Sequence, residues 1–258
     1  MSKKTASETW IKFLGTAGAR FVMIKQLRAS GGLWVRAGKT NVVIDPGPGS
    51  IVRCAASRPK LDPTTLDGII LTHRHLDHAN DANVMIEAMT EGGFKKRGAV
   101  FVPQDALGAD PVILKHALGF IERLEVLTEN KDYAVGDFEF QTTGRLRHSC
   151  ETYGLKFSLK GNSIALLTDT EYFDGLIDQF KADVLILNVV FYQARSGVQH
   201  LCLADAKRII EALRPAKVIL THFGMSMLAA KPHLLAKQIG WETGVDVIAA
   251  ADGMTVSF

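Results

Sequence analysis

The chain of 258 residues is poor in cysteine and has no long uninterrupted apolar run. Its three cysteines, Cys54, Cys150 and Cys202, are far apart and form no Cys-x-x-Cys pair, so the sequence indicates neither a disulfide framework nor a thiolate zinc site. The run Val184 to Phe191, among the longest apolar ones, is too short to cross a bilayer, and Met1 to Thr9 has no apolar segment behind a basic start. We therefore expect a cytoplasmic protein without a signal peptide or a membrane partner.

The sequence also lacks a strong excess of charge of one sign. Thirty Lys and Arg residues against 27 Asp and Glu residues give a net charge of +3, which by itself predicts neither a nucleic-acid nor a membrane partner. No repeat or low-complexity tract separates the chain into parts. With 47% hydrophobic and 22% charged residues, the sequence predicts one globular domain over residues 1–258.

Short apolar runs separated by turns predict a mixed α/β fold. The predicted strands cover residues 10–14, 33–36, 41–44, 68–71, 99–102, 138–143, 155–159, 163–167, 184–187 and 218–220. The predicted helices cover residues 82–89, 204–213 and 232–239. Strands precede helices in both the early and the late part, which predicts mixed sheets with outer helices.

Three imidazoles and one carboxylate are crowded into six residues shortly after the predicted strand 68–71, with the sequence His-Arg-His-Leu-Asp-His at 73–78. In an extended segment, residues two apart face the same way, so His73 and His75 can point into one site. Asp77 and His78 then follow a bend at a helix start and can face a second ion. Imidazole and carboxylate are common ligands of divalent metals, and the cluster therefore predicts a metal site.

Further candidate ligands follow later strands. His148 comes after the strand 138–143, Asp169 after the strand 163–167, and His222 after the strand 218–220. Loops at one edge of a sheet commonly carry functional residues, so we expect these side chains to join the cluster. His116 and His233 fall in helical segments and are interpreted as ordinary helix residues.

The run at 73–78 and the order His148, Asp169, His222 resemble the metallo-β-lactamase superfamily across nearly the whole chain. Phe-Leu-Gly-Thr at 13–16 and Ile-Asp-Pro-Gly at 44–47 are similar to its opening motifs. Within the superfamily, Gln-His-Leu at 199–201 and Leu-Thr-His-Phe-Gly at 220–224 resemble the ribonuclease Z and cyclic phosphodiesterase branch.

The resemblance implies a four-layer αββα sandwich with the site at one edge of two sheets. It also implies the division of a binuclear metal site, with His73, His75 and His148 on one ion, Asp77, His78 and His222 on the other, and Asp169 as the bridge. Two divalent ions, zinc or manganese, would lower the pKa of a shared water. A histidine at 75, where redox di-iron members of the superfamily usually have a carboxylate, favours hydrolysis over electron transfer.

Two catalytic residues are predicted besides the ligands. By the resemblance, Asp77 also orients the attacking water, and His200 contacts the phosphate or protonates the leaving oxygen, which suits a group that titrates near neutrality. The alternative for His200 is a surface histidine before a helix, and Gln199 replaces the glycine that is commoner before this histidine.

Other residues have a functional and a structural interpretation. Asp45 either orients a ligand histidine or is a turn residue before Pro46. Arg145, Arg147 and the run 95–97 either attract a phosphate-bearing substrate or form solvated surface. Gly15, Gly18 and the pair at 31–32 are explained by turns as well as by substrate approach, and we assign them no site role.

The substrate is predicted only by class. The first hypothesis is a phosphodiesterase acting on a small or cyclic phosphodiester or on RNA. The short turn at 92–98 lacks the length of the arm with which ribonuclease Z proteins grip transfer RNA, which favours a small substrate. The second hypothesis is a thioester or lactone hydrolase, and the third is a catalytically idle metal-binding protein. A homodimer is an alternative to a monomer.

Overall fold

The structure is a computed structural model that describes residues 9–258. The expectation of no signal peptide in Met1 to Thr9 thus falls outside the described residues, apart from Thr9. Within residues 9–258, none of the helices combines the length and the apolar character that a bilayer span requires.

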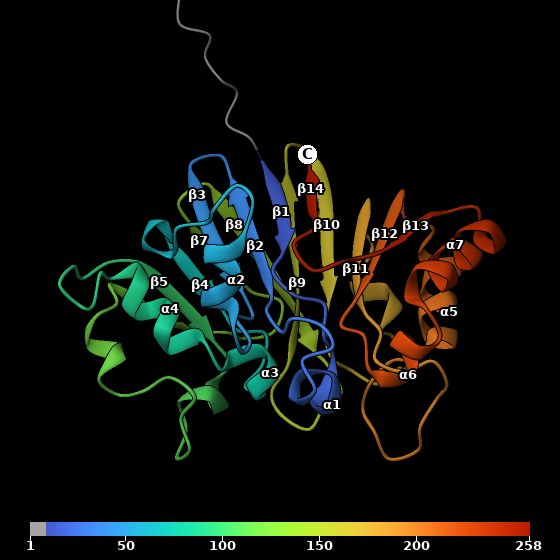
Figure 1. Ribbon diagram of the computed structural model, residues 1–258, viewed down its shortest axis with the longest axis horizontal. Coiled ribbons are helices and arrows are strands. Elements are labelled where there is room, and N and C mark those ends of the chain that lie inside the picture. Colours follow the sequence, from blue (N-terminus) through green and yellow to red (C-terminus); the bar gives the residue numbers. More distant parts are fainter. Residues whose placement is uncertain (1–8) are drawn as a thin grey trace, which may run out of the picture.

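Two seven-stranded sheets form the centre of the molecule (Figure 1). The first sheet has the order β14-β1-β2-β3-β4-β5-β6. Its strands are β1 (Trp10–Phe13), β2 (Leu33–Ala37), β3 (Thr40–Ile44), β4 (Gly68–Ile70), β5 (Ala99–Val102), β6 (Arg123–Val126) and β14 (Thr255–Ser257). Strands β3 to β6 are parallel, and the pairs β14–β1, β1–β2 and β2–β3 are antiparallel.

The second sheet has the order β13-β12-β11-β10-β9-β8-β7. Its strands are β7 (Asp132–Val135), β8 (Phe138–Arg145), β9 (Tyr153–Leu159), β10 (Asn162–Leu167), β11 (Val184–Asn188), β12 (Lys217–Thr221) and β13 (Asp246–Ala249). Strands β10 to β13 are parallel, and β7, β8, β9 and β10 pair antiparallel in turn. Because β8 is two antiparallel steps from β10, both strands end at the same edge of the sheet.

Alternating side chains of the strands build three apolar layers. In β11, Ile186 packs between the two sheets, while Leu185 and Leu187 pack toward the helices. In β4, Ile70 likewise faces the second sheet and Ile69 faces outward. This period of two is the pattern of strands buried on both faces.

Helices close both outer faces of the pair of sheets. Buried residues of α2 (Ser50–Ala56) and α4 (Ala82–Met89) pack on the first sheet, and those of α5 (Leu203–Leu213) and α7 (Pro232–Thr243) pack on the second. The short helices α1 (Ala19–Ile24), α3 (Leu76–Ala79) and α6 (Met225–Ala229) gather at the lower edge in Figure 1. The predicted αββα sandwich is confirmed.

The predicted strands and helices are all present, most with ends shifted by a few residues. The residue pattern did not reveal α1, α2, α6, β6, β7, β13 and β14. Of these, β6 and β14 are edge strands with few buried side chains, so they lack the apolar run on which the prediction relied.

Candidate metal centre

The segment after β4 has the predicted change from extended chain to helix. His75 is extended, with φ −63° and ψ 146°, and it precedes α3, which carries Asp77 and His78. The rings of His73 and His75 meet edge to face at 4.9 Å between centroids. A short strand, a five-residue connection and a short helix therefore bring all four polar side chains to one edge of the first sheet.

The second sheet brings the remaining candidates to the same edge. His148 follows β8, Asp169 follows β10, and His222 follows β12. The structure places these residues against the segment 73–78 in two groups whose candidate ligand atoms lie within 4.8 Å of one another. One group is His73, His75, His148 and Cys150, and the other is Asp77, His78, Asp169 and His222.

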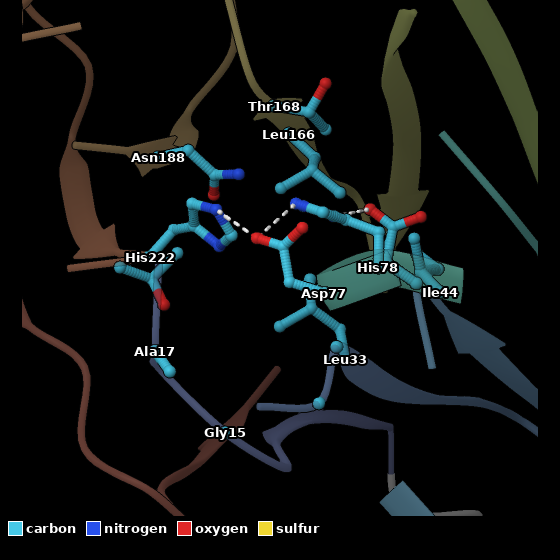
Figure 2. Close-up of a pocket in the computed structure, with 14 residues that line it drawn as sticks. Gly15, Ala17, Leu33, Ile44, Asp77, His78, Leu166, Thr168, Asn188 and His222 are labelled. Carbon is cyan, nitrogen blue, oxygen red and sulfur yellow. Dashed lines mark hydrogen bonds and ion pairs between the residues drawn. The ribbon is translucent and has the colours of Figure 1, made fainter. Parts of the chain in front are cut away.

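In the first group, His148 Nε2 lies 3.0 Å from His75 Nδ1. Two imidazole nitrogens bound to one tetrahedral zinc ion would lie about 3.3 Å apart, so the two rings are close to the spacing of a shared ion. In the second group, Asp77 lies between His78 and His222, as Figure 2 shows. Its Oδ2 is 3.8 Å from His78 Nε2 and 3.6 Å from His222 Nε2.

Asp169 belongs to the second group and also approaches the first. Its Oδ2 is 3.3 Å from His222 Nε2 and 3.4 Å from His78 Nε2. The same oxygen is 3.9 Å from His73 Nε2 in the first group. The other oxygen accepts a hydrogen bond of 2.9 Å from the Asn188 amide, which fixes the plane of the carboxylate.

The buried ring nitrogens around Asp169 test whether a cation fits this site. His73 Nε2, His78 Nε2, His222 Nε2 and His200 Nδ1 are buried and have no hydrogen-bond partner within the described chain. Buried polar atoms without partners are rare because their desolvation is unfavourable. Imidazole nitrogens converging on a buried carboxylate are a donor set that divalent metals satisfy, so the residues fit the predicted ions.

The protonation of the histidines follows from burial and charge. Burial lowers the pKa of His73, His75 and His148, which favours the neutral, metal-binding form. Burial alone would also lower the pKa of His78, but the neighbouring carboxylates, Asp169 first, hold it well above its usual range. Burial opposes ionisation of Asp169, yet the surrounding imidazoles, His222 first, hold its pKa well below its ordinary value.

Hydrogen bonds behind the site orient the rings. The buried Asp45 contacts His78 Nδ1 at 3.0 Å and accepts from the hydroxyl of Thr72 at 2.6 Å and from its amide at 2.7 Å. The same hydroxyl lies 3.2 Å from His73 Nδ1. With its Nδ1 directed to Asp45 or Thr72, each ring leaves Nε2 free for an ion. Of the two interpretations of Asp45, the structure supports the one that orients a histidine.

His148 is oriented by a main-chain group. Its Nδ1 lies 3.0 Å from the carbonyl oxygen of Gln199, which can only accept a hydrogen bond. The ring therefore donates through Nδ1 and presents Nε2 to the site. Because a backbone carbonyl makes this contact and Gln199 does not have a positive φ, the glycine that the resemblance leads one to expect here is not required.

Asp45 and His222 both have left-handed backbone, with φ of 53° and 60°. Such conformations are uncommon for residues other than glycine and persist where the surrounding structure enforces them. A Cβ on Gly18 would lie 2.0 Å from the carbonyl oxygen of His222, so only glycine allows the start of α1 to contact this residue. The structure thereby gives Gly18 a role that its interpretation as a turn residue did not include.

We expect an Asp45→Asn protein to fold and to bind divalent metal about 10- to 100-fold more weakly, because the amide cannot hold the His78 and Thr72 donors as the carboxylate does. Asparagine tolerates the left-handed backbone at this position. Competition with a chromogenic chelator measures the change, and Asp132→Asn, on the exposed surface of β7, is the matched control. Equal metal affinity in the two variants would show that Asp45 is only a turn residue.

His200 lies beside the second group. Its Nδ1 is 3.5 Å from Asp169 Oδ2, and its candidate ligand atom lies within 4.8 Å of those of His148 and Asp169. Burial lowers its pKa. The structure thus contradicts the interpretation of His200 as a surface histidine and brings it to the site.

The basic run 95–97 lies away from the candidate metal centre. Arg97 contacts Asp67 at 3.2 Å and Lys95 contacts Glu91 at 2.6 Å, just before β5 and hence at the strand ends opposite to the site. Arg147 stacks on Phe173, with its guanidinium carbon 4.8 Å from the ring centre. These contacts favour the structural interpretation of the basic run. His233 is exposed on α7, as expected, whereas His116 is exposed in a turn that precedes the short 3-10 helix Ala117–Gly119 and is not a helix residue.

Sequence reasoning missed three residues at the site. Thr72 and Asn188 act only through hydrogen bonds to Asp45 and Asp169, and a lone threonine or asparagine gives no motif. Cys150 was set aside because it forms no Cys-x-x-Cys pair. Its position two residues after His148 is the signal that could have placed it near the first group.

Comparisons with known proteins agree with this geometry. A family model described as "Beta-lactamase superfamily domain" matches residues 40–223. "Uncharacterized protein MJ1374" of Methanocaldococcus jannaschii is 31% identical over 255 residues, covering 95% of this chain and 94% of that protein. "Probable metallo-hydrolase YhfI" of Bacillus subtilis is 24% identical over 204 residues, covering 75% and 80%.

Solved structures share the fold. The crystal structure of YhfI superposes with a TM-score of 0.79 at 19% identity, covering 97% of this chain and 100% of that one. A diphosphatase from the PhnP family gives a TM-score of 0.72 at 20% identity, covering 97% of each chain. Human tRNase Z, short form, gives a TM-score of 0.68 at 19% identity, covering 96% of this chain and 98% of that one. With its fold shared by these proteins and a family model that matches well over half of its length, the chain belongs to the metallo-β-lactamase superfamily.

Proposed function

We propose that the protein is a binuclear metal-dependent phosphodiesterase that acts on a small or cyclic phosphodiester. The observation that carries the proposal is the position of Asp169, whose Oδ2 lies within 4 Å of ring nitrogens from both groups of candidate ligands. The PhnP-family diphosphatase and tRNase Z that share the fold support phosphate-ester chemistry over other reactions.

We assign His73, His75 and His148 to one ion, Asp77, His78 and His222 to the other, and Asp169 to both. Bound there, zinc or manganese would lower the pKa of water and neutralise charge on phosphoryl oxygens. Imidazole at position 75 keeps the first group free of a carboxylate of its own, which supports hydrolysis over redox chemistry.

Two side chains of the protein can supply a proton acceptor and a proton donor for the reaction. Asp77 lies between His78 and His222 in the second group and can accept a proton from the attacking water. His200, 3.5 Å from Asp169, can contact the phosphate or donate a proton to the departing oxygen. Water adds to phosphorus, one ester P–O bond breaks, and the alcohol leaves with a proton.

A hydrolysis panel with the purified protein tests the proposal. Phosphodiesters, thioesters and lactones are offered to protein loaded with zinc or with manganese and to chelator-treated protein. We expect metal-dependent cleavage of phosphodiesters to exceed that of the other classes. Faster cleavage of thioesters or lactones would favour the thioester or lactone hydrolase. If metal-bound protein hydrolysed none of the compounds, the result would favour a catalytically idle metal-binding protein.

A further inference from the structure

A cavity of about 880 Å³ opens on the candidate metal centre. Its floor includes His75, His148, Asp169 and His200. Sites for small organic molecules typically have volumes of about 300–1,000 Å³. The cavity is therefore much larger than a phosphate group alone requires, and its remaining walls face the rest of the substrate.

Those walls are largely apolar. We call Phe21, Ile24, Leu76, Phe191 and Val198, which all line the cavity, the apolar wall. Phe21 and Ile24 are each 66% exposed and Leu76 is 64% exposed. Single exposed apolar residues are common, but several around one cavity mark a binding surface.

The apolar wall comes from segments that are far apart in the sequence. Phe21 and Ile24 lie on α1, whereas Phe191 and Val198 belong to the segment between β11 and α5. The chain at the start of α1 is fixed to the site, because the amide of Gly18 donates to the carbonyl of Phe223 at 3.0 Å. The start of α1, the helix that carries Phe21 and Ile24, is thus held next to His222.

Two guanidinium groups line the same cavity. Arg20 precedes Phe21 on α1, and the guanidinium carbon of Arg195 lies 5.3 Å from the centre of the Phe191 ring. Arginine recognises phosphate oxygens and also stacks on aromatic faces. The cavity therefore offers metal ligands and positive charge to an anion, and apolar side chains to a neutral group attached to it.

We propose that the substrate is a small phosphodiester with an aromatic ring on one ester group, and that the apolar wall binds this ring. The proposal rests on the phosphodiesterase function proposed above. An RNA chain fits less well, because it would need an extended basic surface, and the basic run 95–97 lies at the opposite strand ends.

Binding of phosphate monoesters tests the ring site without requiring turnover. Phenyl phosphate and methyl phosphate differ only in the group that would face the apolar wall. We expect metal-loaded protein to bind phenyl phosphate at least about 10-fold more tightly than methyl phosphate in calorimetry. Burial of an apolar ring of this size raises the affinity by at least about that factor. Equal affinity for the two esters would overturn the proposal.

Substitutions in the apolar wall test whether it binds the ring of phenyl phosphate. Phe21→Ala and Val198→Ala, from the two different segments that line the cavity, are expected to reduce the preference for phenyl phosphate several-fold and to leave methyl phosphate binding unchanged. Phe94→Ala, with an exposed ring in the turn before β5, is the control and should change neither. Equal weakening of both esters by the wall variants would contradict a ring site.

The outcomes separate the two proposals. A preference for phenyl phosphate without cleavage of any phosphodiester would contradict the proposed function and keep the ring site. Cleavage of phosphodiesters without such a preference would contradict the ring site alone. Affinity that rises with the length of an oligoribonucleotide, and exceeds that for phenyl phosphate, would overturn the small aromatic substrate in favour of RNA.

Discussion

An Asp169→Asn protein is expected to fold normally, to hold about one divalent ion where the wild-type chain holds about two, and to lose at least about 100-fold in turnover. The substitution keeps the size of the side chain but removes the charge that lies within 4 Å of both groups of ring nitrogens. The amide oxygen can still accept from Asn188, so the position remains packed.

Metal content by elemental analysis and turnover are measured on the same preparations, with circular dichroism to confirm the fold. Asp178→Asn, which changes an exposed carboxylate farther along the same segment, should match the wild type in both respects. A folded Asp169→Asn protein with two ions and wild-type turnover would show that this residue is not the bridge. A wild-type protein that saturates at one ion would contradict the binuclear site itself.

The His200→Ala protein is expected to keep both ions and to lose phosphodiester turnover by about 10²- to 10⁴-fold, the usual contribution of acid–base assistance. A phosphodiester transition state places charge on non-bridging oxygens and on a leaving alkoxide, and an imidazole 3.5 Å from Asp169 can assist at both. A thiolate leaves with much less help from a proton donor, so thioester hydrolysis should be far less sensitive to this substitution.

His233→Ala is the matched control, because it removes an exposed imidazole from α7. Near wild-type phosphodiester turnover in His200→Ala would identify His200 as a bystander. Loss of an ion from this variant would instead make His200 a metal ligand, which its proximity to His148 and Asp169 allows. Metal content and kcat from one preparation distinguish these results.

The candidate ligands could be predicted from the sequence better than the arrangement of the two sheets that brings them together. His73, His75 and His78 could be grouped because they are adjacent in the chain, and His148, Asp169 and His222 because each follows an apolar strand. Their convergence requires both sheets to end at one edge, which strand patterns alone do not specify and the resemblance supplied.

The site residues that the sequence did not predict act through contacts between segments that are far apart in the chain. Thr72 supports His73 only because Asp45, 27 residues earlier, accepts its hydroxyl proton. The apolar residues of α1 do not form one buried face, since Val22 is buried whereas Phe21 and Ile24 are exposed at the cavity. A short exposed helix of this kind gives no signal in a pattern that looks for buried faces.

The pairing of β14 with β1, in the register Trp10↔Ser257, has a consequence for how the chain reaches this structure. The first sheet gains the edge strand β14 from residues that are synthesised after every strand of the second sheet. Until then β1 is an open edge, with backbone groups free to pair with another chain. Contacts between residues so far apart in the sequence slow folding. In the nascent chain, the edge strand β1 therefore stays open to pairing with another chain until β14 has been synthesised and has paired with it.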